Sequence, residues 1–316
     1  MTTAAASWPR SRRFDNLRRI RGLDPETDFE TIFRLITVYE FPWDFWQSAS
    51  LAFFRTFGIP SIATLLDRTG EITRHTQKRA DDTLLVLYEI GRLGMETDEG
   101  RAYLRRMNQM HRRYSISNAD NLYIIALYVT EPVEWINRYG WRRLTAHEQR
   151  ALTAYARRLA RLMGIKDVPT TYDGLVAYAR DYESRHFAAT DSSCRLAAAA
   201  MDISADMLPA VLRRPLAPLM RRFSLALLDD PLLDATGLPR PAAGDRRAAV
   251  GVLRLRAWLL RASSPRPDDR PHSLELASYP HGHTLADVGP VRLPGQAHPA
   301  LSAGLPSGEG HGQDDQ

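Results

Sequence analysis

Cysteine and lysine are scarce in this sequence. Cys194 is the only cysteine among 316 residues, so no disulfide can form within the chain, and a reducing compartment suits it. We expect Cys194 to be a buried structural thiol. Only Lys78 and Lys166 are lysines, so arginine supplies nearly all of the positive charge. This arginine bias, with abundant alanine and proline, is typical of GC-rich coding sequences and favours a bacterial source.

Long apolar runs are absent as well. No stretch reaches the ~18 uninterrupted apolar residues of a membrane-spanning helix, so we predict no transmembrane segment. Residues 1–22 contain six arginines and one acidic residue, without the apolar core of a secretion signal. We therefore predict a solvated, partly disordered arm over residues 1–22 and a cytoplasmic protein.

Neither sign of charge dominates. The chain has 42 basic and 37 acidic residues, and the two signs are mixed along the sequence rather than gathered in a stripe. No nucleic-acid-binding module accompanies the net charge of +5. Phosphate-binding glycine-rich loops, internal repeats and alternating strands and helices are also missing. The sequence thus argues against a nucleic-acid partner and against a nucleotide-binding fold.

Most of the sequence shows the periodicity of helices. Its 44% of hydrophobic residues are enough for a substantial core. We predict an all-α fold with a single large helical domain over residues 23–262. From Ser263 the composition shifts to proline, glycine, serine and histidine with little periodicity, which predicts a disordered tail over residues 263–316. The five histidines of this tail are scattered, so we assign them no metal site.

Local signals predict several helix boundaries. Thr145 and Glu148 have the spacing of a capping box, so a helix should begin there and end before Gly164. Thr97 has the small polar character of an N-cap for a helix that includes His111. Further helices are predicted over residues 28–70 with a new start at Pro42, over 121–137, after 170–171, over 205–228 and over 248–262.

Two consecutive predicted helices, one with Arg79 and Thr83 and the next with His111, direct an arginine, a threonine and a histidine toward one interior space. Arg79 and Thr83 lie one turn apart, in line with the apolar residues that follow them. On the next helix Leu104, Met107 and His111 form one stripe, so the imidazole points where a core residue would. Such a histidine is either a satisfied core residue or a ligand of haem iron. Spacing alone leaves both interpretations open.

An ordered set of motifs extends this stretch. It consists of Arg-x-x-x-Thr, a helix ending in His with a Tyr three residues later, an aromatic segment and Tyr-Gly-Trp-Arg-x-Leu-Thr. This pattern resembles the family of the mpaB and latex-clearing-protein (rubber oxygenase) oxygenases, over about residues 14–190. The matching positions are Arg79 and Thr83, His111 and Tyr114, residues 118–122, Glu131 and Pro132, and residues 139–145.

The resemblance implies a helical haem-b protein that uses dioxygen to cleave or oxidise a hydrophobic small molecule, such as an isoprenoid or another unsaturated chain. It implies that His111 is the proximal iron ligand and that Arg79 and Thr83 are catalytic residues lining the haem pocket. In the rubber-cleaving branch a lysine precedes the threonine, whereas this chain has Asp82. Rubber-type chemistry on the distal side of the iron is therefore not expected. The oligomeric state is not predicted.

Three other functions remain open from the residues. A non-catalytic haem-binding protein, a gas sensor or carrier, would keep His111 without a substrate chamber. A helical scaffold would have no cofactor, a packed and satisfied His111, and no room for a macrocycle between the two helices. A di-iron oxidase needs two Glu-x-x-His motifs, and Glu183 with His186 forms the one copy in the sequence. We expect that pair to lie on a helix surface.

Overall fold

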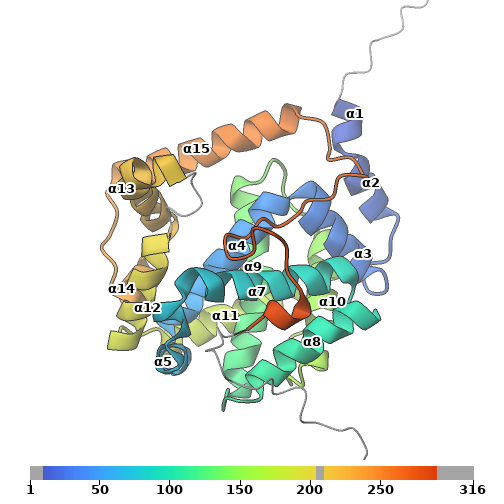
Figure 1. Cartoon of the computed structure of the whole chain (residues 1–316). Helices are drawn as coiled ribbons and strands as arrows, with labels where there is room; N and C mark the ends of the chain where they lie inside the picture. Colours follow the sequence, from blue (N-terminus) through green and yellow to red (C-terminus); the bar gives the residue numbers. More distant parts are fainter. Residues whose placement is uncertain (1–9, 204–209, 290–316) are drawn as a thin grey trace, which may run out of the picture.

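The computed structural model describes residues 10–203 and 210–289, and within these ranges the chain is helical without any strand (Figure 1). The prediction of an all-α fold is therefore confirmed. The α-helices are α1 (Arg10–Arg13), α2 (Asp15–Arg21), α3 (Phe29–Arg34), α4 (Pro42–Arg55), α5 (Pro60–Thr69), α6 (Glu71–Arg74), α7 (Thr76–Leu93), α8 (Asp98–His111), α9 (Asn118–Tyr139), α10 (Ala146–Leu162), α11 (Tyr172–His186), α12 (Asp191–Asp202), α13 (Ala210–Leu227), α14 (Asp230–Thr236) and α15 (Ala243–Ala262). A π-helix, η1 (Leu35–Glu40), and two 3₁₀ turns, η2 (Thr56–Gly58) and η4 (Leu285–Asp287), complete the elements.

Helix α9 lies at the centre of the molecule and packs against α4, α10, α11 and α15 (Figure 1). It begins where the Ser117 side chain accepts a hydrogen bond from the backbone of Asp120. Its apolar residues recur every three or four positions and are almost fully buried. Pro132 lies inside the helix without ending it. The main buried residues of this stripe are Leu122, Ile125, Val129, Val133 and Ile136.

The predicted caps are confirmed. The Thr97 hydroxyl accepts from the backbone of Gly100 at the start of α8. Thr145 and Glu148 form the complete capping box of α10, which ends at Leu162, two residues before Gly164. These short-range signals depend only on neighbouring residues, which is why the sequence alone reports them. Helices α12 and α14 were not predicted.

The N-terminal arm is more ordered than predicted. Residues 10–21 form α1 and α2, and Arg13 is buried. Its guanidinium lies 3.8 Å from the ring centre of Trp141 and donates a hydrogen bond to the carbonyl oxygen of Leu260. The prediction of a solvated, partly disordered arm is thus wrong in that residues 10–21 are helical and Arg13 is held by burial and a cation–π contact, whereas Arg12, Arg18, Arg19 and Arg21 are exposed. Residues 1–9 lie outside the described residues.

The segment after α15 also departs from the prediction of a disordered tail. Residues 263–289 run across α7 and η1 as the orange-to-red loop in Figure 1. Tyr279 donates a hydrogen bond to the Asp82 carboxylate, and Lys78 bridges Asp82 (2.7 Å) and the carbonyl oxygen of Asp287 (2.9 Å). These contacts join residues about 200 positions apart. The composition of the segment gives no sign of such long-range contacts. The rest of the predicted tail, 290–316, lies outside the described residues.

Two smaller findings concern Cys194 and the membrane. Cys194 is half-buried, against the expectation of full burial, and it lies under Gly237, where an added Cβ would be 2.6 Å from its Sγ. No single described helix is long and apolar enough to cross a membrane. Pro42–Gly58 and Pro60–Thr69 meet those criteria only as a pair, and the pair is bent by 100°.

Candidate functional site

Arg79 and Thr83 contact each other on one face of α7, as the sequence predicted. The Arg79 guanidinium donates to the Thr83 hydroxyl, which itself donates to the Arg79 carbonyl oxygen at 3.0 Å. The guanidinium also lies over the ring of Phe53 from α4, 5.5 Å from its centre. Helices α4 and α7 pack on each other, so this cation faces an aromatic side chain rather than water. Thr83 is thereby held in one orientation.

Arg79 has no ion-pair partner among the described residues. Burial is the main cause that lowers the pKa of its guanidinium, and nearby Tyr128 and Asp82 only partly oppose this. The Asp82 carboxylate is instead bound by Lys78, Tyr279 and the backbone of Gly289. Arg79 is half-buried, and a cation that is partly removed from water without a counter-charge is unfavourable. This position therefore favours binding of an anionic group.

His111 is the last residue of α8. Its Nδ1 atom is buried and has no hydrogen-bond partner among the described residues. Burial, and next the positive charge of Arg79, lower the pKa of the imidazole, so the ring is neutral at neutral pH. A neutral imidazole keeps the lone pair that a metal ion needs. His111 is thus not the satisfied core histidine that a scaffold without cofactor predicts.

The space beside these residues is apolar. Tyr128 on α9 lies near Arg79, and burial strongly raises the pKa of its phenol. Tyr128 and Leu87, which follows Thr83 by one turn of α7, line a cavity of about 30 Å³. Its other walls are aromatic and aliphatic side chains of α3, α4, α9 and α10. Neither Arg79 nor His111 lines this cavity, which is about the size of one water molecule.

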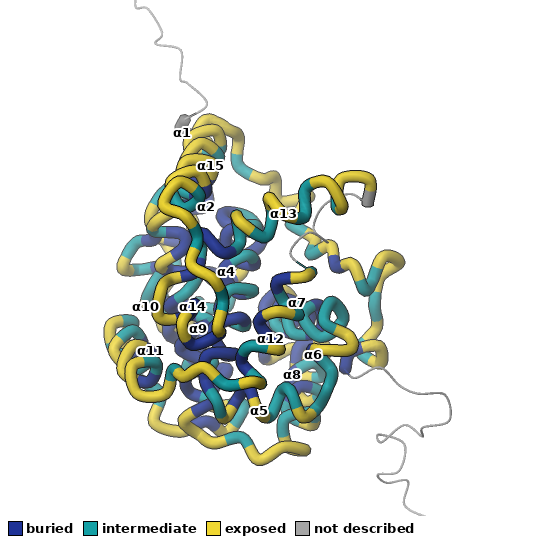
Figure 2. Tube along the Cα trace, turned by 90° about the vertical axis from the view of Figure 1, so that its left-hand side faces the viewer, coloured by how far each residue is buried: buried dark blue, intermediate teal, exposed yellow. Residues whose placement is uncertain are grey.

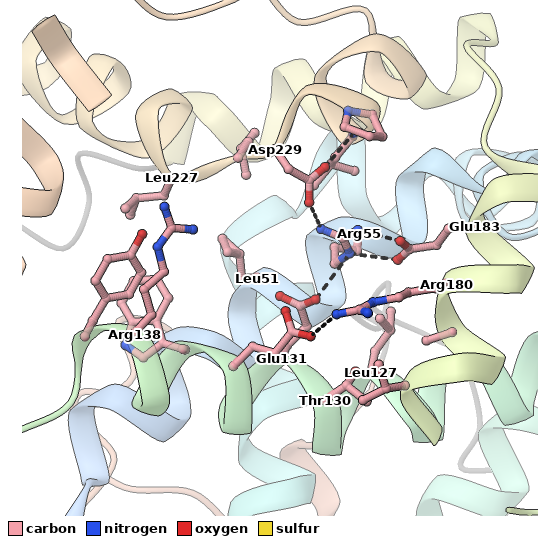
Figure 3. A pocket seen from close by; sticks show the side chains of 18 of the residues that line it. Leu51, Arg55, Leu127, Thr130, Glu131, Arg138, Arg180, Glu183, Leu227 and Asp229 are labelled. Atoms are coloured by element: carbon pink, nitrogen blue, oxygen red, sulfur yellow. Dashed lines mark hydrogen bonds and ion pairs between the residues drawn. The ribbon is translucent and has the colours of Figure 1, made fainter. Parts of the chain in front are cut away.

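A second, larger cavity of about 440 Å³ lies on the other side of α4 and α9, with Arg55 at its centre (Figure 3). The Arg55 guanidinium is bound by both Glu183 oxygens (2.6 and 2.8 Å), by Asp229 and by Glu131 at 3.4 Å. Tyr123 donates a further hydrogen bond to Glu183 at 2.8 Å. One arginine thus connects α4 with α9, α11 and the start of α14. The cluster has more carboxylates than cations, and it is well suited to hold helices together.

This cluster corrects the interpretation of Glu183. The residue is not on the helix surface, because its carboxylate is 15% exposed and bound to Arg55. His186 is exposed, as predicted, and its ring stacks on Tyr182. In the described part of the chain, no three His, Cys, Asp or Glu side chains come together as a possible metal site. The geometry therefore does not favour the di-iron interpretation.

Glu131 makes the Arg55 cluster sensitive to pH. Burial raises the pKa of its carboxyl to about 7; Arg55 opposes the shift, while Glu134 and Glu183 add to it. The folded-state pKa is above the unfolded value, so the charged form opposes folding and stability falls as the pH rises toward 7. Between pH 5 and 8 this group should lower the free energy of unfolding by about 2–3 kcal/mol.

Replacing this carboxyl with an amide should remove that dependence. In urea unfolding at pH 5, 6, 7 and 8, Glu131→Gln is expected to gain about 2–3 kcal/mol relative to the wild type as the pH rises. Glu26→Gln is the matched control, because its side chain is 59% exposed and it does not contribute to the pKa shift of Glu131. Parallel pH profiles for Glu131→Gln and the wild type would contradict the assignment.

The run 139–145 is structural. Arg142 pairs with Glu40 at 3.0 Å and with both oxygens of Glu148 at 2.8 and 2.9 Å. Trp141 packs between the rings of Phe14 and Phe41. These contacts fasten the start of α10 to η1. The motif therefore builds the fold around the site and does not reach Arg79.

Some residues of the site were not singled out from the sequence. Phe53 belongs to the aromatic-rich segment 43–57, whose density is compatible with either core or pocket wall. Tyr128 lies in the apolar segment of α9, and its hydroxyl is the only feature that distinguishes it from an ordinary core residue. Arg55 carried a usable signal, because a charged residue within an apolar run is seldom buried without partners.

The comparisons with known proteins agree with one another. The sequence model described as "ER-bound oxygenase mpaB/B'/Rubber oxygenase, catalytic domain" matches residues 51–262. The ER-bound oxygenase mpaB' of Penicillium brevicompactum is 25% identical over 327 aligned residues, with 82% of this chain and 76% of that protein covered.

Two shorter matches are to proteins named ER-bound oxygenase mpaB. The protein of Penicillium brevicompactum is 29% identical over 165 residues, which cover 46% of this chain and 42% of that protein. The protein of Penicillium roqueforti is 31% identical over 132 residues, which cover 40% and 44% respectively. Because the family match spans more than half of the chain, this protein belongs to the mpaB/B' and rubber oxygenase family and is an oxygenase of that family.

Proposed function

We propose that this oxygenase depends on haem b and uses dioxygen to cleave or oxidise a hydrophobic substrate, with His111 as the proximal iron ligand. The observation that carries the proposal is a neutral imidazole whose buried Nδ1 has no partner, near a half-buried arginine without an ion pair among the described residues. Haem fits both, because its iron takes an imidazole nitrogen and its propionates are anionic.

The residues around this position would divide the work. When bound, haem supplies the iron that activates dioxygen. His111 supplies a nitrogen lone pair, and Arg79 holds an anionic group and fixes the Thr83 hydroxyl as a hydrogen-bond donor or acceptor. Phe53 and the apolar walls near Tyr128 exclude water.

The family description includes rubber oxygenases, which supports a hydrophobic substrate. Asp82 faces residues 279–289 rather than Arg79, which supports a distal side unlike that of the rubber-cleaving branch. We further propose residues 23–262 as the haem-binding domain and the cytoplasm as the compartment. The names of the fungal relatives place those proteins at the endoplasmic reticulum.

The visible absorption spectrum tests the proposal. The purified protein, or the protein after addition of haemin, is expected to show a Soret band that shifts on reduction with dithionite and again with carbon monoxide, to a position typical of histidine ligation. Oxygen uptake with unsaturated hydrophobic substrates then separates an oxygenase from a haem carrier or gas sensor. A protein that stays colourless after addition of haemin would overturn the proposal.

A further inference from the structure

Exposed apolar side chains are concentrated on two neighbouring helices. Of the eight large apolar residues that are markedly exposed in the described part of the chain, seven lie on α13 and α15, which pack on each other. Figure 2 shows much of α15 along the outside of the molecule as exposed. Soluble surfaces rarely gather so many. The seven are Val211, Leu212, Leu219, Val252, Leu255, Trp258 and Leu259.

Helix α15 has two apolar faces. Ala249 and Leu253 are buried against the rest of the molecule. The opposite face carries Leu255 (58% exposed), Trp258 (67%) and Leu259 (55%). The smaller residues that share the outer face are Ala248, Gly251, Val252 and Ala262, so this face contains no charged residue. A helix at a protein surface normally presents polar side chains to water. The outer face is therefore built for an apolar environment.

A row of arginines borders this outer face. Arg247, Arg254 and Arg261 follow one another at seven-residue spacing, are exposed, and form no ion pair with any described residue. Their side of the helix adjoins Trp258. On the other border Arg256 is neutralised by Asp44 at 2.9 Å. The unneutralised row is complementary to a surface with regularly spaced negative charges.

We propose that the outer face of α15, with the adjoining exposed part of α13, docks onto the surface of an anionic lipid bilayer. The leucines and Trp258 would enter the boundary between headgroups and acyl chains, and the arginine row would meet lipid phosphates. A helix that lies in the interface needs no spanning length. A second copy fits less well, because an antiparallel twofold contact of α15 with itself sets arginine row against arginine row.

Vesicle binding tests this proposal independently of haem and of activity. The full chain is incubated with vesicles of phosphatidylcholine alone or with 30% phosphatidylserine, and bound protein is measured by co-sedimentation. Binding is expected to require phosphatidylserine and to weaken with salt. Arg254→Gln with Arg261→Gln should weaken it about 30-fold, and Leu255→Gln with Leu259→Gln at least about tenfold. All four side chains are exposed, so the variants should fold normally.

Tyr114→Ser is the control, because Tyr114 is exposed (40%) but lies between α8 and α9 rather than on α13 or α15. Its binding should equal that of the wild type. Absence of binding to either vesicle, or unchanged binding of the Leu255 and Leu259 double variant, would overturn the proposal. So would a dimer in sedimentation equilibrium that the double variant dissociates, since the face would then cover a second copy.

Discussion

His111→Ala is expected to lower the affinity for haem at least about 100-fold. The Nδ1 atom of His111 has no hydrogen bond to lose among the described residues, so the variant should fold as the wild type does. What disappears is a neutral imidazole near Arg79 whose Nδ1 atom is buried. Titration with haemin, followed at the Soret band, measures the affinity, and circular dichroism checks that the helices are intact.

Two further measurements identify the cause of this loss. His186→Ala removes an exposed imidazole that stacks on Tyr182 and hydrogen-bonds through Nδ1 to the Tyr182 carbonyl oxygen at 2.8 Å. Neither contact involves α7 or α8, so this variant should bind haem normally. Added imidazole should restore the spectrum of His111→Ala by entering the space that the side chain leaves. A variant that retains full haem occupancy without added imidazole would show that His111 is not the iron ligand.

Arg55→Leu is expected to lower the free energy of unfolding by about 3–5 kcal/mol at pH 8. The arginine side chain is 10% exposed and is the common partner of Glu131, Glu183 and Asp229. Leucine would leave three carboxylates close together without a cation. Their repulsion weakens as they become protonated, so the loss should be smaller at pH 6. Urea unfolding at both pH values measures it.

Arg180→Leu provides the comparison. Arg180 lies at the same cavity, but it is 73% exposed and pairs only with Glu134 at 3.2 Å. An exposed pair of this kind contributes about 0–1 kcal/mol. If Arg55→Leu were no more destabilising than Arg180→Leu, the buried cluster would not be what joins α4, α9, α11 and α14.

The residues that sequence analysis placed correctly are those governed by their neighbours. Thr97 and Thr145 begin helices because a hydroxyl reaches an amide three positions away. Arg79 and Thr83 meet because one helical turn separates them. The contact of Arg79 with Phe53 and the cluster at Arg55 involve partners brought together by packing, and no local pattern encodes that.

The same reason explains the error over residues 263–289. Proline, glycine and polar residues without periodicity are typical of disorder. Here, however, the backbone amide of Ser278 donates to Asp81 and that of Gly289 donates to Asp82, so carboxylates of α7 satisfy groups that a tail would leave to water. A few individual side chains hold this segment in place, and the amino-acid composition of the segment does not reveal such contacts.

The contacts of Asp82 bear on where this protein can be shortened. The match to the family ends at residue 262, which suggests an obvious place to cut. A cut there would remove Tyr279 and Gly289 and leave Asp82, now 5% exposed, without two of its three partners on the helix that carries Arg79. The independently folding unit therefore extends to at least residue 289, and it is longer than the region of family likeness.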